Sequence, residues 1–100
     1  MVHRLAARAR IDLDEIWEYL YQHTGDETVP DRQVELITAR FELLSTWPRL
    51  GRRRDDLRRG LRSHPVGSWI IFYRIERGDV VILRVLHGRR DLPALLGRGS

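Results

Sequence analysis

Residues 69–86 read WIIFYRIERGDVVILRVL, and their pattern sets the architecture of the chain. Two runs rich in β-branched and aromatic residues, 69–75 and 80–86, flank the turn sequence Arg77-Gly78-Asp79. Such runs are typical of strands covered on much of both faces, and a short glycine-containing turn between them is typical of an antiparallel hairpin. We therefore predict two long adjacent strands at the centre of a β-sheet.

The pattern extends this hairpin in both directions. Residues 61–64 are a further strand candidate, and Pro65-Val66-Gly67-Ser68 has the composition of a turn, so a β-meander is predicted over about 61–87. After it, residues 87–91 (HGRRD) form a charged exit loop, and residues 92–96 (LPALL) form a short apolar tail segment. The meander is preceded by an arginine-rich connection at 49–60, which we expect Leu50 and Leu57 to hold in place.

The N-terminal half predicts an antiparallel helical hairpin over about 6–47. Apolar residues recur there at helical spacing in two stripes: Ala9, Leu13, Ile16, Trp17 and Leu20, then Val34, Ile37, Phe41 and Leu44. Gly25 suits a helix end, Thr28 is a candidate N-cap, and Trp47-Pro48 stops the second helix. With a short strand at 2–5, the chain is predicted to be an α+β two-layer domain, with helices on one sheet face and the other face partly open.

Composition excludes several classes of protein. The chain has 100 residues, enough for one core, and no cysteine, which excludes disulfide scaffolds, cysteine-bound zinc and thiol catalysis. No aliphatic or aromatic run exceeds the five residues 69–73, and no apolar stretch follows the early arginines, so neither a transmembrane helix nor a signal peptide is expected. A cytoplasmic location is the default expectation, and no membrane contact is expected.

The positive charge comes entirely from arginine, and the net charge differs between the two halves of the chain. All eighteen basic residues are arginines; residues 1–50 carry a net charge of −3 and residues 51–100 a net charge of +7. A basic half indicates either a polyanion or an acidic protein partner, and an ordinary solubilising surface is the alternative. Asp55 and Asp56 partly neutralise the run Arg52-Arg53-Arg54, so direct nucleic-acid binding is not expected.

Five motifs in order across residues 2–96 resemble the RelE/ParE superfamily of toxins from bacterial type II toxin–antitoxin modules. They are Ala9-x-x-Asp12-Leu13-x-x-Ile16-Trp17-x-Tyr19, Pro48-Arg49-Leu50-Gly51, Leu61-Arg62, Phe72-Tyr73-Arg74 and Val85-Leu86-His87-Gly88-Arg89-Arg90-Asp91. The last motif resembles the ParE branch more than the RelE branch. The resemblance implies the RelE/ParE-like fold for the whole chain, as one toxin domain.

The resemblance also implies a function. ParE-like members block DNA gyrase, which would make this chain a gyrase-inhibiting toxin with a role in growth arrest and plasmid stabilisation. It would need no cofactor and would form a hetero-oligomer with a ParD-like antitoxin. RelE-like members instead cut messenger RNA in the ribosomal A site. A ribosome-dependent mRNA endonuclease and a non-toxic relative that only binds its antitoxin therefore remain as alternatives.

Two sets of candidate site residues follow. A nuclease would use Arg62, His64, Tyr73, His87 and Arg90, with Arg84 as a further phosphate clamp. RNA-cleaving relatives carry a Tyr or His near the C-terminus, which this chain lacks after His87, and arginine does not readily donate a proton. Tyr73 is also expected to be a core residue, and two isolated histidines do not predict a metal site.

Binding of an antitoxin or target is the preferred use of the basic half. Arginine forks pair with carboxylates in bidentate fashion, so an acidic antitoxin segment is expected to wrap the chain and supply Asp or Glu to them. The candidate binding residues combine cations with the apolar tail: Arg58, Arg59, Arg62, Arg84, His87, Arg89, Arg90, Leu95 and Leu96.

Overall fold

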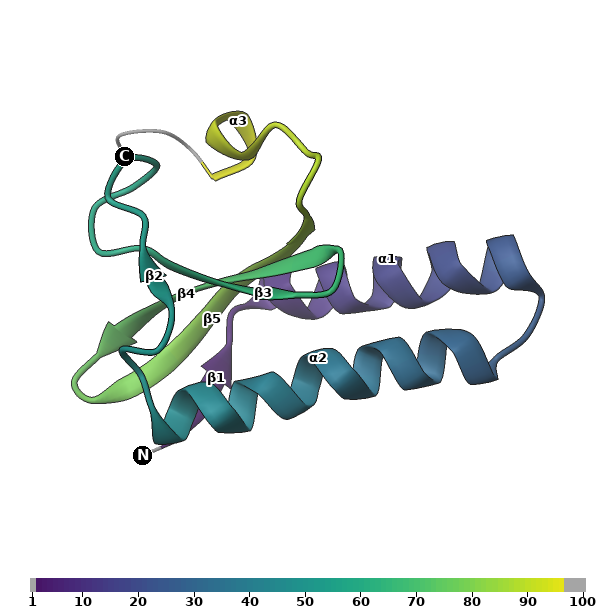
Figure 1. Cartoon of the computed structure of the whole chain (residues 1–100), viewed down its shortest axis with the longest axis horizontal. Coiled ribbons are helices and arrows are strands. Elements are labelled where there is room, and N and C mark those ends of the chain that lie inside the picture. The colour runs from purple at the N-terminus through teal and green to yellow at the C-terminus, as the bar shows by residue number, and fades with distance from the viewer. Residues whose placement is uncertain (1, 97–100) are drawn as a thin grey trace.

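The computed structural model describes residues 2–96 and has the predicted α+β architecture (Figure 1). Its elements are β1 (His3–Leu5), α1 (Ala7–Thr24), α2 (Thr28–Thr46), β2 (Arg52–Arg53), β3 (Arg62–Val66), β4 (Trp69–Glu76), β5 (Asp79–His87) and α3 (Leu92–Leu96). The strands form one sheet in the order β1-β5-β4-β3-β2, in which only β1 and β5 are parallel neighbours. Helices α1 and α2 pack against each other as a long hairpin.

The ends of the hairpin helices follow local chemistry. Gly25 adopts φ 67° and donates its N–H to the Tyr21 carbonyl at 2.7 Å, as expected of a glycine after a helix. The predicted N-cap at Thr28 is wrong, because Thr28 is already helical and its N–H donates to the Asp26 carboxylate at 2.9 Å. Trp17 of α1 donates its indole N–H to Asp31 of α2 at 2.8 Å, which ties the two helices together.

The central hairpin has the predicted turn. Arg77 and Gly78 both have positive φ, 54° and 85°, which is the geometry of a tight turn matched to the twist of two antiparallel strands. Strand β3 runs on through Pro65 to Val66, further than predicted. Because β2 pairs only with Arg62 and Ser63, the outer edge of β3 is free at Pro65, where a missing N–H is tolerated.

Both faces of the sheet are covered. The main core lies between the sheet and the hairpin helices and includes Ile37, Phe41, Ile71 and Tyr73, all buried. A second cluster of buried residues covers part of the opposite face: Leu57, Leu61, Phe72, Leu86 and Leu96. This partial cover is consistent with the predicted two-layer arrangement. Apolar side chains project from both faces of β4. Those on the face away from α1 and α2 are covered by the loop after β2 and by helix α3.

The arginine-rich connection contains one element that the sequence did not predict. Arg52 and Arg53 form the short edge strand β2, paired with Ser63 and Arg62 of β3. Two arginines carry no strand propensity of their own, so this pairing depends on the neighbouring strand. Leu57 is buried as expected, but Leu50 is 51% exposed, and the prediction that it anchors the connection is wrong.

Candidate functional site

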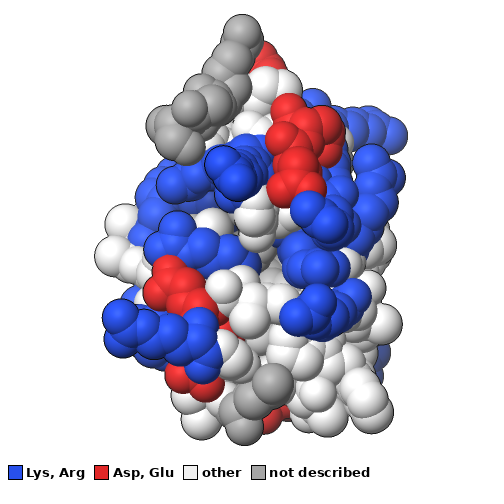
Figure 2. All heavy atoms as spheres, turned by 90° about the vertical axis from the view of Figure 1, so that its left-hand side faces the viewer, with Lys and Arg blue, Asp and Glu red and all other residues white. Residues whose placement is uncertain are grey.

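Arginines gather on the side of the molecule that carries β2 and the loop that follows it (Figure 2). Part of this charge is neutralised locally, because Arg53 pairs with Asp55 at 2.8 Å and Arg54 with Asp56 at 3.2 Å. The Gly60 amide donates to Asp55 at 2.9 Å and, with Arg53, lowers the pKa of that carboxyl group. The loop thus folds around its own ion pairs.

Five other arginines lie in β2, in the loop after it and in the exit loop at 87–91. Within residues 2–96, no ion pair is formed by Arg52, Arg58, Arg59, Arg89 or Arg90. Arg58 is partly buried and the other four are exposed. Four of these five belong to the predicted binding set, which stays a prediction, and Arg52 is an addition to it.

Arg62 and Tyr73 face inward and hold a turn. The Tyr73 hydroxyl donates to the Pro48 carbonyl at 2.7 Å and accepts the Gly51 N–H at 2.8 Å. Arg62 donates to the Gly51 carbonyl at 2.8 Å and to the Arg49 carbonyl at 3.4 Å. A side chain at Gly51 would collide with the Tyr73 hydroxyl, so this close approach requires glycine.

Arg84 is also engaged inside the protein. Its Nε donates to Asp12 Oδ2 at 2.8 Å, its Nη2 to Asp12 Oδ1 at 3.1 Å and its Nη1 to the Leu95 carbonyl at 3.2 Å. Asp12 is buried and also accepts the Val85 N–H at 2.9 Å. Val85 lies past the part of β5 that pairs with β1, so Asp12 takes the place of a strand partner there. Arg84 therefore joins α1, β5 and α3, and its guanidinium is not free for a partner.

The two candidate histidines have different surroundings. His64 lies half-buried against Arg40 of α2, whose guanidinium Nη1 is 3.4 Å from His64 Nε2. Burial, followed by the Arg40 charge, lowers the pKa of His64. His87 Nδ1 accepts the Arg89 N–H at 3.1 Å, and its ring contacts Trp69 edge-on, so it shapes the exit loop.

These contacts determine what chemistry the predicted nuclease set can perform. Tyr73 is fully buried, burial raises its pKa, and both hydrogen-bonding sides of its hydroxyl are occupied by backbone. Arg62 is opposite Tyr73 in the β3–β4 register and is committed to the same turn. Arg62 and Tyr73 therefore both hold the turn at 48–51. Of the predicted nuclease set, Arg90 is exposed, whereas Arg62, His64 and His87 are partly buried.

The apolar tail is packed rather than displayed. Leu96 is buried in the second cluster and Leu95 packs against it. Both residues are in the predicted binding set, but on α3 they pack inward against the second cluster instead of lying on an open surface.

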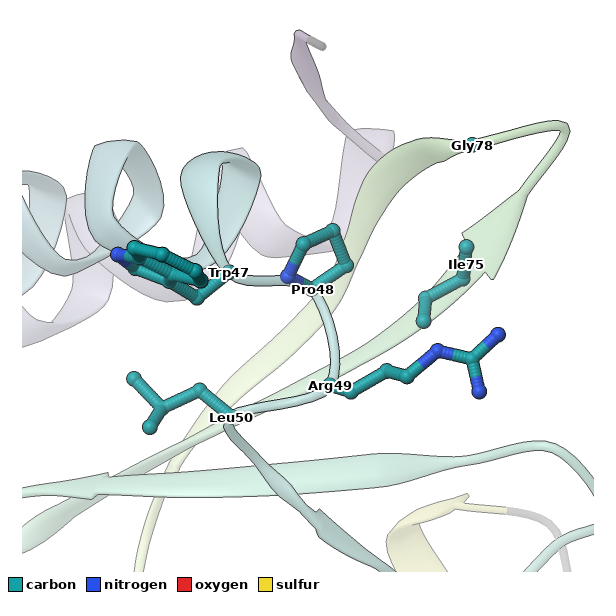
Figure 3. Close-up of a pocket in the computed structure, with 6 residues that line it drawn as sticks. All are labelled: Trp47, Pro48, Arg49, Leu50, Ile75 and Gly78. Carbon is teal, nitrogen blue, oxygen red and sulfur yellow. The ribbon is translucent and has the colours of Figure 1, made fainter.

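A hollow that the sequence did not single out lies between the end of α2 and the β4–β5 hairpin. Its volume is about 540 Å³, and it is lined by Trp47, Pro48, Arg49, Leu50, Ile75 and Gly78 (Figure 3). Trp47 is 63% exposed, more than any other large apolar side chain among residues 2–96. A Trp-Pro pair at a helix stop, followed closely by Leu50, was the sequence signal that could have found it.

Two further classes of site were sought in the described part of the chain. Residues 2–96 contain no cluster of three or more His, Asp or Glu side chains that could hold a metal ion. None of their helices combines the length and apolar character that crossing a membrane requires.

Known proteins show clear similarity to this chain. A sequence model of the family described as "ParE toxin of type II toxin-antitoxin system, parDE" matches residues 4–92. Toxin ParE3 of Caulobacter vibrioides is 45% identical over 87 residues, which covers 87% of this chain and 86% of that protein. Toxin ParE1 of Mycobacterium tuberculosis is 35% identical over 89 residues, covering 88% and 90%.

Solved structures share the fold. A chain of the chromosomal ParDE toxin–antitoxin system from P. aeruginosa superposes with a TM-score of 0.77 at 20% identity, covering 87% of this chain and 95% of that one. A chain of the toxin–antitoxin complex RelBE2 from M. tuberculosis superposes with a TM-score of 0.63 at 30% identity, covering 86% and 95%. The chain therefore belongs to the ParE family, the toxins of type II toxin–antitoxin systems.

Proposed function

We propose that this ParE-type toxin arrests growth by binding DNA gyrase and that a ParD-like antitoxin neutralises it. The observation that carries the proposal is that some arginines and Tyr73 make internal contacts while other arginines do not. Arg62, Arg84 and Tyr73 are engaged in internal contacts. Arg59, Arg89 and Arg90 are exposed and Arg58 is partly buried, and none of the four forms an ion pair among residues 2–96. This arrangement supports inhibition by binding.

The antitoxin part of the proposal is supported by charge. The two superposed structures come from toxin–antitoxin systems, and the present chain has a net charge of +4. Exposed guanidinium groups pair well with carboxylates, so an acidic segment of the antitoxin would bind across the loop after β2 and the exit loop. His87, which orders the exit loop, would position Arg89 for that contact.

A supercoiling assay with purified DNA gyrase tests the target. Excess toxin should inhibit supercoiling, and stoichiometric antitoxin should restore it. Absence of inhibition at excess toxin would remove gyrase from the proposal. A-site cuts in messenger RNA, mapped in a translating extract, would identify the nuclease alternative, and induction without growth arrest would identify a non-toxic relative.

Variants of the exposed arginines test the surface. Arg89→Ala with Arg90→Ala should weaken antitoxin binding, with a loss that shrinks as salt rises, because exposed charges are screened. Arg10→Ala is the matched control, an exposed arginine on α1 without an ion pair among residues 2–96. The proposal places the toxin in the cytoplasm, where gyrase acts, and includes a role in plasmid stabilisation.

A further inference from the structure

The hollow beside Trp47 combines apolar walls with one cation. Trp47 and Leu50 lie on one side of it, and Ile75 and the Arg49 side chain on the other (Figure 3). No carboxylate is among the six lining residues, and Arg49 forms no ion pair within residues 2–96. Trp47 and Leu50 are 63% and 51% exposed, so two large exposed apolar side chains and an unpaired guanidinium line opposite sides of the same hollow.

The backbone that carries these side chains is held rigidly. Tyr73 and Arg62 together bind three carbonyls and one N–H of residues 48–51, and Leu50 donates its N–H to the Trp47 carbonyl at 3.0 Å. The buried groups thus fix a turn whose own side chains point to solvent. A surface fixed before binding loses little conformational entropy when a partner docks.

We propose that this hollow is a docking site for a segment of the antitoxin that carries a bulky apolar side chain next to a carboxylate. The apolar side chain would fill the space between Trp47 and Ile75, and the carboxylate would pair with Arg49. The inference rests on the proposed antitoxin partnership and adds to it a second contact, apart from the exposed arginines of the two loops.

Charge complementarity favours this occupant over a second copy of the chain. In a two-fold symmetric contact the same patch meets itself, which would bring Arg49 toward its own copy on a chain of net charge +4. An acidic segment instead supplies the carboxylate that the hollow lacks. The hollow, of about 540 Å³, is large enough to receive an anchor side chain of a peptide segment.

Titration of the toxin with its purified cognate antitoxin tests the site. Trp47→Ala with Leu50→Ala should weaken binding about 30-fold, the effect of removing an interface hot spot. Leu36→Ala on α2 is the matched control, since Leu36 is 51% exposed, the same as Leu50, and does not line the hollow. Arg49→Glu should weaken binding more at low salt than at high salt.

Fluorescence gives a direct readout. Trp47 emission should shift to shorter wavelength when antitoxin covers it, and Trp47→Phe should remove that shift while keeping most of the affinity. Thermal melts that match the wild type show that each variant folds.

Three results would overturn the site. Unchanged antitoxin affinity of both the double variant and Arg49→Glu, with wild-type binding intact, would overturn the docking proposal alone. Loss of gyrase inhibition with unchanged antitoxin affinity would make the target the occupant instead. Failure of the wild-type toxin to bind antitoxin at all would overturn the antitoxin proposal together with this site.

Discussion

Tyr73→Phe removes one oxygen atom from the centre of the protein and should destabilise it strongly. The hydroxyl accepts the buried Gly51 N–H at 2.8 Å and donates to the Pro48 carbonyl at 2.7 Å. An unsatisfied buried donor costs about 1–3 kcal/mol, and the half-buried carbonyl adds about 1 kcal/mol. We expect the free energy of unfolding to fall by about 3 kcal/mol.

Urea denaturation followed by tryptophan fluorescence measures this loss. The midpoint should fall while the m-value stays unchanged, since the surface exposed on unfolding is nearly the same. For a chain of this length, each kcal/mol of lost stability lowers the melting temperature by about 4 °C or more. The expected loss therefore lowers the melting temperature by at least about 10 °C. Tyr19→Phe is the control, because Tyr19 is 55% exposed and its hydroxyl forms no hydrogen bond within residues 2–96.

The same variant separates a positioning role for Tyr73 from a catalytic one. If Tyr73→Phe is as stable as Tyr19→Phe, within about 0.5 kcal/mol, the hydroxyl does not hold the turn and the reasoning is refuted. If it is stable but has lost its toxicity, Tyr73 acts chemically. Retained growth arrest at a temperature where the variant is folded is the expected result.

Three further perturbations have defined outcomes. Asp12→Ala leaves the Arg84 charge without its partner and should cost about 3–5 kcal/mol in urea denaturation, whereas Asp12→Asn, which keeps an acceptor, should cost less. Burial lowers the pKa of His64, so near neutral pH and below the unfolded chain binds more protons at this residue than the folded chain does. The stability that depends on neutral His64 is therefore fully present above the ordinary pKa of 6.5 and is lost as the pH falls below it. His64→Gln should flatten that part of the stability–pH curve, and an unchanged slope would contradict the assignment. Gly51→Ala should destabilise the chain because its Cβ meets the Tyr73 ring and hydroxyl, and a melt identical to wild type would show that the turn adapts.

The local patterns predicted most of the elements. The helical stripes, Gly25 and the turn at Arg77-Gly78 act over a few residues, so periodicity and turn chemistry were sufficient to find α1, α2 and the β4–β5 hairpin. Apart from the N-cap at Thr28, the expectations that failed involved contacts with residues distant in the sequence. Strand β2 exists because β3 pairs with it, and Leu50 is exposed because Tyr73 and Arg62 hold the turn around it.

By itself the sequence determined the class of fold, the ParE-family motifs and an excess of arginine in residues 51–100. Only the tertiary structure decided which arginines are free. A guanidinium bonds whichever acceptor the fold brings near: Asp12, 72 residues away, for Arg84, and the carbonyls of residues 49 and 51 for Arg62. These pairings depend on strand register and helix packing. Composition therefore shows only the number of cations, and the fold decides which of them make internal contacts and which are left without an ion pair among residues 2–96.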